Sequence, residues 1–227
     1  MAHRLFTEIE KVVAIYAPLE VIRPAIFAEE AELLRKAVAS RRFEFAAGRT
    51  LARAALKTLG FSAQPIPIAE GRFPIWPDGV VGSISHSFSL VATAVALSDD
   101  LAGIGIDVQE RNSVSGKDTE SIATPNEQRK LAERSRGLDA TILFACKEAV
   151  YKSVNPIIGE FLEFHDVEVS VVGSGFEARC RPDKRSALPI SSGQGHLASV
   201  GGHIVALYRV PTGFGQLAQS AGKSTPP

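Results

Sequence analysis

The spacing of hydrophobic and polar positions at the start of the chain predicts one strand followed by two helices. Residues 11–16 (KVVAIY) form a short apolar run that is typical of a strand. Residues 28–39 mix charged and apolar side chains as a surface helix does. A second helix is expected from Ser40, which can cap its start, to Gly60, which can end it. Residues 65–79 are rich in proline and glycine, so we expect them to be irregular.

The middle of the chain contains two apolar runs and then a helix signal. Residues 90–97 and 102–108 are separated by a short acidic segment, which predicts a buried antiparallel pair of strands. Thr124 and Glu127 have the spacing of a capping box, with proline at the first helical position between them. A helix is therefore predicted to begin there and to end near Gly137.

The last third of the chain changes from a helical pattern to strand patterns. Asp139 can cap a helix that carries residues 144–152 (FACKEAVYK). That helix is expected to stop before Asn155-Pro156, because the residue before a proline is disfavoured in a helix. Strand patterns follow at residues 167–172, 176–181 and 196–210.

This order of helices, strands, helices and strands predicts an α+β fold in two halves. The N-terminal half is expected to comprise residues 1–108 and the C-terminal half residues 109–214. The tail, residues 215–227, is poor in apolar side chains, so we expect it to be disordered.

Composition limits the possible partners and the location of the protein. The formal net charge is zero, so the molecule has no overall field that would attract it to nucleic acid or to an acidic membrane. Cys146 and Cys180 lack metal-ligand spacing and suit a reducing compartment. Acidic residues interrupt the N-terminal segment, which argues against a signal peptide, and the apolar runs are too short for a membrane span. We therefore expect a cytoplasmic protein.

Three short segments carry the residues best suited to chemistry. Lys147, Glu148 and Lys152 lie within about two turns of the predicted helix. Asp107 ends an apolar run, and His86 stands between two serines, Ser85 and Ser87. Carboxylates, lysines and a histidine together suit a divalent metal that holds a polyphosphate ester.

Each of these features also has a plainer explanation. Glu148 and Lys152 have the spacing of an ordinary ion pair on a helix surface. Asp107 could be a turn residue, and His86 could be a hydrogen-bonded surface histidine. The arginines of the second helix could form a solvated stripe. The glycine-rich segments match neither a P-loop nor a dinucleotide-binding fingerprint.

Taken together, the segments resemble those of a known family, the large single-chain 4′-phosphopantetheinyl transferases, similar to the enterobactin and surfactin activating enzymes. The resemblance is carried by residues 41–56 (RRFEFAAGRTLARAAL), 71–87 (GRFPIWPDGVVGSISHS), 103–110 (GIGIDVQE) and 144–152 (FACKEAVYK), which occur in the order of the family. It implies two similar α/β halves arranged as a pseudo-dimer. It also implies that coenzyme A and Mg²⁺ bind in the cleft between them.

The resemblance assigns expected roles to individual positions. Asp107 and Glu148 match the metal-binding carboxylates, and Lys152 and Lys147 match the lysines near the pyrophosphate. His86 and Arg72 match groups that hold phosphates of coenzyme A, and Arg49 and Arg53 are expected in its nucleotide pocket. Ser85 is also expected to contact coenzyme A. The family usually has a second acid two residues after the aspartate, where this chain has Gln109, followed by Glu110. Because alternate residues of a strand share a face, Gln109 is expected near the metal, ligating weakly or through water.

The implied activity is transfer of the 4′-phosphopantetheine arm of coenzyme A to a serine of an acyl or peptidyl carrier protein. Glu148 is the expected proton acceptor and Lys152 assists the transfer. Two alternatives remain open: a coenzyme A-binding module without transferase activity, and a metal-dependent phosphoesterase that uses the same residues on water. A two-halved chain also has less need to self-associate, so we expect a monomer.

Overall fold

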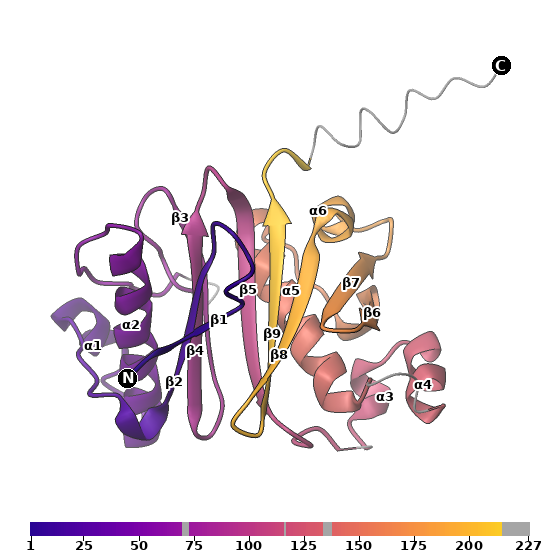
Figure 1. Cartoon of the computed structure of the whole chain (residues 1–227), viewed down its shortest axis with the longest axis horizontal. Helices are drawn as coiled ribbons and strands as arrows, with labels where there is room; N and C mark the ends of the chain where they lie inside the picture. Colours follow the sequence, from indigo (N-terminus) through magenta and orange to yellow (C-terminus); the bar gives the residue numbers. More distant parts are fainter. Residues whose placement is uncertain (70–72, 116, 134–137, 215–227) are drawn as a thin grey trace.

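The computed structural model describes residues 1–69, 73–115, 117–133 and 138–214 (Figure 1). The strands form two antiparallel sheets. The first sheet has the order β1-β2-β4-β3, with β1 His3–Leu5, β2 Val13–Pro18, β3 Val80–His86 and β4 Leu90–Leu97. The second has the order β5-β9-β8-β7-β6, with β5 Leu101–Glu110, β6 Val167–Val172, β7 Gly175–Cys180, β8 Gln194–Val200 and β9 His203–Pro211.

Each sheet is covered on its outer face by one long helix. The α-helices are α1 Ala28–Leu33, α2 Ala39–Thr58, α3 Thr119–Ile122, α4 Pro125–Ala132, α5 Ala140–Ile158 and α6 Ala187–Ser192, with two short 3₁₀ turns, η1 Leu19–Val21 and η2 Phe164–Asp166. Helix α2 packs on the first sheet and α5 on the second; Figure 1 shows α2 at the left and α5 behind the strands of the second sheet. This arrangement confirms the predicted α+β fold in two halves.

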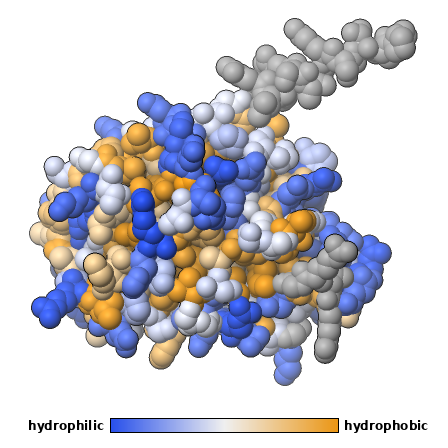
Figure 2. All heavy atoms as spheres, in the orientation of Figure 1, coloured by the Kyte–Doolittle hydropathy of each residue, from blue (hydrophilic) through white to orange (hydrophobic). Residues whose placement is uncertain are grey.

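The inner faces of the two sheets pack against each other. Small side chains on β4 (Ala92, Ala94 and Ala96) contact branched ones on β5 (Ile104, Ile106 and Val108). Burial of such apolar surface is the main force that joins the halves. Polar and apolar residues are interspersed over the face shown in Figure 2. None of the helices in the described ranges is long and apolar enough to cross a bilayer.

The predicted pairing of residues 90–97 with 102–108 is wrong. β4 pairs with β2 and β3, whereas β5 pairs with β9 more than ninety residues later. Both runs are apolar on both faces, so their pattern could not show which strands they join. The two sheets divide at the turn 98–100, and the expected boundary after residue 108 falls inside β5.

Other predicted boundaries shifted for local reasons. Helix α2 begins at Ala39 after Val38, so Ser40 does not cap it. Helix α5 continues through Pro156 and ends at Ile158, where the following Gly159 caps it with a left-handed φ of 64°. The caps Thr124 and Asp139 are confirmed. The strand β3 was missed within a serine- and glycine-rich segment, and the expected helix end at Gly137 and the tail lie outside the described residues.

Candidate active site at the junction of the two sheets

Two glycines of β5 allow helix α5 to approach the strand very closely. A Cβ atom on Gly105 would lie 1.9 Å from the carbonyl oxygen of Ala149, and one on Gly103 would lie 2.2 Å from that of Ser153. Since alternate residues of a strand share a face, Asp107 follows these glycines on the side of α5. Glycine therefore brings a carboxylate of β5 close to the middle turns of α5.

Asp107 is held by side chains from three elements. It is 2% exposed, and its Oδ1 accepts hydrogen bonds from Lys152 Nζ of α5 (2.5 Å) and from Ser85 Oγ of β3 (2.9 Å). Ser85 Oγ also accepts from the backbone N–H of Val108, which ties the edge of the first sheet to β5 (3.2 Å). The Lys152 ammonium balances the charge that would otherwise be costly to bury.

Gln109 lies on the same face as Asp107, as the strand alternation predicted. Its side-chain amide donates to Asp107 Oδ2 (2.8 Å), so Gln109 orients the carboxylate. Glu110 is exposed. The family's second acid is therefore replaced here by a neutral side chain that hydrogen bonds to the first.

Glu148 is the second carboxylate of the site. Burial raises the pKa of the Glu148 carboxyl; the Lys152 ammonium opposes that shift and the Asp107 charge adds to it. Among the described residues, Glu148 makes no hydrogen bond, whereas both carboxylate oxygens of Asp107 accept hydrogen bonds. The Glu148 carboxylate is thus available to bind a cation or to accept a proton.

The donors present fit a magnesium ion. Asp107 and Glu148 supply hard carboxylate oxygens close enough for the charge of one to raise the pKa of the other. The described ranges contain no cluster of three or more histidine, cysteine or acidic side chains that could hold a metal. Mg²⁺ commonly binds through one or two carboxylates and completes its shell with water and substrate phosphate. The two acids therefore suit a metal that arrives with a phosphate ligand.

His86 lies at the end of β3 in a second polar cluster that also includes Arg41 and Glu44 of α2. Arg41 Nη1 donates to His86 Nε2 (2.8 Å), and Glu44 Oε2 lies 3.6 Å from Arg41 Nη1 and 3.7 Å from His86 Nε2. Burial lowers the pKa of His86, and Glu44 opposes this shift while Arg41 and Lys152 add to it. A neutral imidazole and a guanidinium here can both bind an anion.

Arg41 was missed by the sequence reasoning, which singled out other arginines of the same helix. A signal was available: Arg41 and Arg42 are adjacent, and neighbours on a helix point about 100° apart, so only one can face the sheet. Arg42 faces away and donates to the carbonyl of Ala37.

Arg49 and Arg53, which are expected in the nucleotide pocket, are buried inside the N-terminal half, where their guanidinium groups contact other parts of the protein. Arg49 Nε donates to the Ile66 carbonyl (2.7 Å), its guanidinium lies 4.2 Å from the centre of the Phe45 ring, and burial lowers its pKa to about 10. Arg53 forms an ion pair with the fully buried Glu30 (2.8 Å). Their burial contradicts the solvated-stripe alternative for these two residues, and their place in the nucleotide pocket stays a prediction.

Replacing Arg53 by methionine should lower the free energy of unfolding by about 3–5 kcal/mol, because the Glu30 carboxylate would remain buried without its partner. Denaturant unfolding measures this loss, and the exposed Lys57→Met variant on the same helix is the control. If Arg53→Met kept its stability but lost affinity for coenzyme A, Arg53 would be a coenzyme A contact and not a structural residue.

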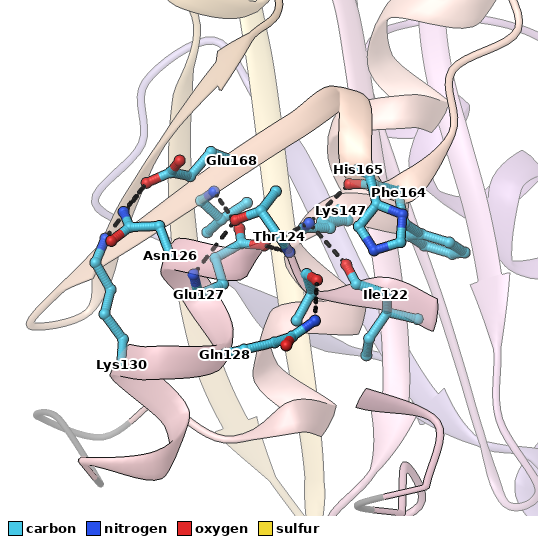
Figure 3. A network of polar contacts seen from close by, with 12 residues as sticks. Ile122, Thr124, Asn126, Glu127, Gln128, Lys130, Lys147, Phe164, His165 and Glu168 are labelled. Atoms are coloured by element: carbon cyan, nitrogen blue, oxygen red, sulfur yellow. Dashed lines mark hydrogen bonds and ion pairs between the residues drawn. The ribbon is translucent and has the colours of Figure 1, made fainter. Parts of the chain in front are cut away.

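Lys147 is also directed away from Asp107. Its ammonium is buried and donates to Glu127 Oε2 (2.7 Å), the Ile122 carbonyl (2.8 Å) and the Phe164 carbonyl (2.7 Å), as Figure 3 shows. All three of its donors are therefore used. Lys147 and Glu148 are sequence neighbours, so they lie on different faces of α5. Their closeness in the sequence therefore does not place them in one site.

A cavity of about 490 Å³ lies between the edge of the first sheet and α5. Glu148 and Lys152 line it on one side, and its apolar walls include Trp76, Ile84, Tyr151 and Ile157. Arg72 lies outside the described residues; the next residue, Phe73, lines the same cavity. The junction thus combines an apolar cavity with an acidic and basic cluster, which is the usual form of a small-molecule site.

Comparison with family models identifies both halves. Residues 29–96 match the 4′-phosphopantetheinyl transferase N-terminal domain, and residues 103–207 match the 4′-phosphopantetheinyl transferase superfamily. The interval between the matches contains the turn from β4 to β5, where the two sheets divide.

Curated relatives agree with these matches. The chain is 36% identical over 154 residues to the 4′-phosphopantetheinyl transferase Svp of Streptomyces mobaraensis, covering 64% of this chain and 61% of that protein. It is 35% identical over 147 residues to PptT, the 4′-phosphopantetheinyl transferase of Mycobacterium tuberculosis, covering 63% of each. Enterobactin synthase component D of Escherichia coli is 36% identical over 124 residues, 53% of this chain and 58% of the relative. The chain thus spans less than two thirds of the length of these relatives.

Among solved structures, the Thermotoga maritima holo-[acyl-carrier-protein] synthase is similar with a TM-score of 0.40 and 26% identity, over 49% of this chain and 64% of that one. The two family matches, one on each half, decide the assignment. The chain belongs to the 4′-phosphopantetheinyl transferase superfamily.

Proposed function

We propose that this protein transfers the 4′-phosphopantetheine arm of coenzyme A to a serine of an acyl or peptidyl carrier protein and releases 3′,5′-ADP. The observation that carries the proposal is that Glu148 and Lys152 line the cavity between the two halves while Lys152 is bonded to Asp107. Membership of the superfamily supports the same reaction.

The positions of the charged groups suggest how coenzyme A would lie. The pyrophosphate suits the Lys152 and Ser85 side chains around Asp107. The apolar cavity suits the pantetheine arm, and Arg41 with His86 suits the 3′-phosphate. Arg72 stays a prediction for the same phosphates. Charge-assisted hydrogen bonds of this kind supply both affinity and orientation.

In the proposed reaction a carrier serine oxygen forms a bond to the β-phosphorus, and the bond from that phosphorus to the bridging oxygen breaks. Glu148 accepts the serine proton, and its raised pKa makes it a better base than an ordinary glutamate. Lys152 neutralises charge on the leaving phosphate. Bound Mg²⁺, held by Asp107 and Glu148, would supply Lewis-acid stabilisation of the phosphate oxygens.

Gln109 contributes through Asp107. Its hydrogen bond to Oδ2 fixes the carboxylate, and its neutral amide is a weaker magnesium ligand than the acid usual at this position. We expect Gln109→Glu to lower the Mg²⁺ concentration needed for half-maximal activity, since a second acid would face the metal. An unchanged Mg²⁺ dependence would show that residue 109 does not contribute to the metal site.

The proposal extends to partners and location. The carrier protein is the macromolecular partner, and no nucleic-acid or membrane contact is required for the reaction. The two cysteines are both free thiols, which suits a cytoplasmic location. A single chain already contains both halves of the site, so we propose that it acts as a monomer.

Incubation with coenzyme A, Mg²⁺ and an apo carrier protein, followed by mass spectrometry of the carrier, tests the activity. A mass gain equal to one phosphopantetheine arm supports the transferase. Cleavage of coenzyme A without any carrier would indicate a phosphoesterase instead, and binding without either reaction would indicate a coenzyme A-binding module.

The role of the Arg41–His86 cluster has its own test. Dephospho-coenzyme A, which lacks the 3′-phosphate, should bind about tenfold to a hundredfold more weakly than coenzyme A, because a charge-assisted contact is lost. Arg41→Ala should largely remove that difference, whereas Arg42→Ala, on the neighbouring and exposed residue, should preserve it. Titration calorimetry measures both affinities. A difference that survives in Arg41→Ala would place the 3′-phosphate elsewhere.

A further inference from the structure

We propose that Lys147 is a positioning residue for Glu148, and that it acts through a buried network and not by contact with coenzyme A. This inference rests on the proposed function, in which the Glu148 carboxylate accepts the serine proton. Resemblance to the family suggests a phosphate contact for Lys147, but the geometry points to a different role.

The Lys147 ammonium joins four segments of the C-terminal half. From α5 it reaches the carbonyl at the end of α3 (Ile122), the first turn of α4 (Glu127) and the 3₁₀ turn η2 (Phe164), as Figure 3 shows. Only 3% of the residue is exposed. A lysine ammonium has three donors, and three protein acceptors leave none of them for a ligand.

The partner of Lys147 is as tightly held as the lysine itself. Glu127 is fully buried; its Oε2 also accepts from the backbone N–H of Thr124 (2.7 Å), and its Oε1 accepts from that of Val169 (2.6 Å). The pair therefore connects α5 to the capping box of α4 and to β6. Burial lowers the pKa of Lys147, and the hydrogen bond and charge of Glu127 oppose that shift.

Glu148 depends on this network because it has little support of its own. Its carboxylate makes no hydrogen bond within the described ranges, so its position follows from that of its helical turn. That turn is fixed on one side by close packing against Gly105 and on the other by the bonds of Lys147. Small displacements of a catalytic group cost large factors in rate.

The hydrogen bonds of Lys147 also border a second groove next to Glu148. A groove of about 390 Å³ shares Glu148 and Tyr151 with the cavity of about 490 Å³, and its lining also includes Ser121, Phe164 and Lys147. The Lys147 bonds to Ile122 and Phe164 tie together the two segments that border this groove. Loss of Lys147 should therefore loosen the surroundings of Glu148 but not those of Asp107.

The experiment compares Lys147→Met with the double variant Lys147→Met/Glu127→Gln. Rates and affinities are measured at a temperature below the melting temperature of each variant. The single variant leaves a buried carboxylate unpaired, so its melting temperature should fall. The double variant removes that charge and should recover part of the stability. Its amide nitrogen would face one of the two backbone N–H groups from which Glu127 accepts, and Ile122 and Phe164 remain without their donor. We expect kcat to fall by about tenfold or more in both variants. We expect the dissociation constant of coenzyme A to stay unchanged.

Lys130→Met is the matched control. Lys130 belongs to the edge of the same network, where its more exposed ammonium contacts Ser170 and Glu168. We expect wild-type stability, coenzyme A affinity and kcat from it.

Two results would overturn the inference. Loss of coenzyme A affinity in Lys147→Met would make Lys147 a ligand contact. Recovery of kcat in a stable double variant would make its role purely structural. Absence of transfer by the wild-type protein is a separate outcome, which would reject the proposed function itself before any variant is compared.

Discussion

Glu148→Gln is expected to lower kcat for transfer to the carrier protein by roughly 10²–10⁴-fold, the usual contribution of a general base. Glutamine keeps the size of the side chain but cannot accept the serine proton, and it is a weaker ligand for Mg²⁺. The fold should be retained, because the Glu148 carboxylate makes no hydrogen bond to the described residues. Steady-state rates from carrier mass measurements give the effect.

Glu110→Gln is the matched control, since Glu110 is an exposed acid three residues after Asp107. It should keep wild-type kcat and Mg²⁺ dependence. If Glu110→Gln were inactive and Glu148→Gln normal, Glu110 and not Glu148 would be the proton acceptor and metal ligand.

Gly105→Ala should impair both the fold and the activity. The added Cβ would lie 1.9 Å from the Ala149 carbonyl oxygen and 2.7 Å from the backbone nitrogen of Ser153, so α5 must move away from β5. Overpacking of this kind costs about 1–3 kcal/mol. The displaced helix also carries Glu148 and Lys152 away from Asp107, and a misplacement of about 1 Å can cost a factor of about 10² in rate.

Gly175→Ala provides the comparison, because a Cβ there would make ordinary contact, 3.4 Å from the nearest atom. Denaturant unfolding and the transfer assay should show a clear loss for Gly105→Ala and little change for Gly175→Ala. Equal stability of the two variants would mean that α5 does not rest on β5 as closely as described.

The sequence predicted best those features that depend on residues close together in the chain, such as helix caps and the alternation of side chains along a strand. The capping box of Thr124 and Glu127 and the cap Asp139 formed as predicted, because each depends on residues within one helical turn. The strand alternation at Asp107 and Gln109 also held. The meeting of Asp107 with Lys152 could be expected only from the order of the motifs, since the contact joins residues forty-five positions apart.

Features that depend on tertiary packing were not predictable from the pattern. The partner of β5 is β9, and two uniformly apolar runs carry no information about which strands they join. Arg53 and Lys147 are basic residues of the kind that often binds phosphate. Each instead forms an ion pair with a buried glutamate. Helix geometry indicates that only one of Arg41 and Arg42 can face the sheet, but the contact of Arg41 with His86 depends on the relative orientation of α2 and β3.

The most direct test of the central claim is ³¹P NMR of bound coenzyme A with Mn²⁺ in place of Mg²⁺. If the pyrophosphate lies with a metal at Asp107 and Glu148 while the 3′-phosphate lies at Arg41 and His86, the pyrophosphate resonances should broaden strongly and the 3′-phosphate resonance less. Asp107→Asn should remove the selective broadening, because the metal loses a carboxylate ligand. Equal broadening of all phosphate resonances, or the same selective pattern in Asp107→Asn, would contradict the proposed site.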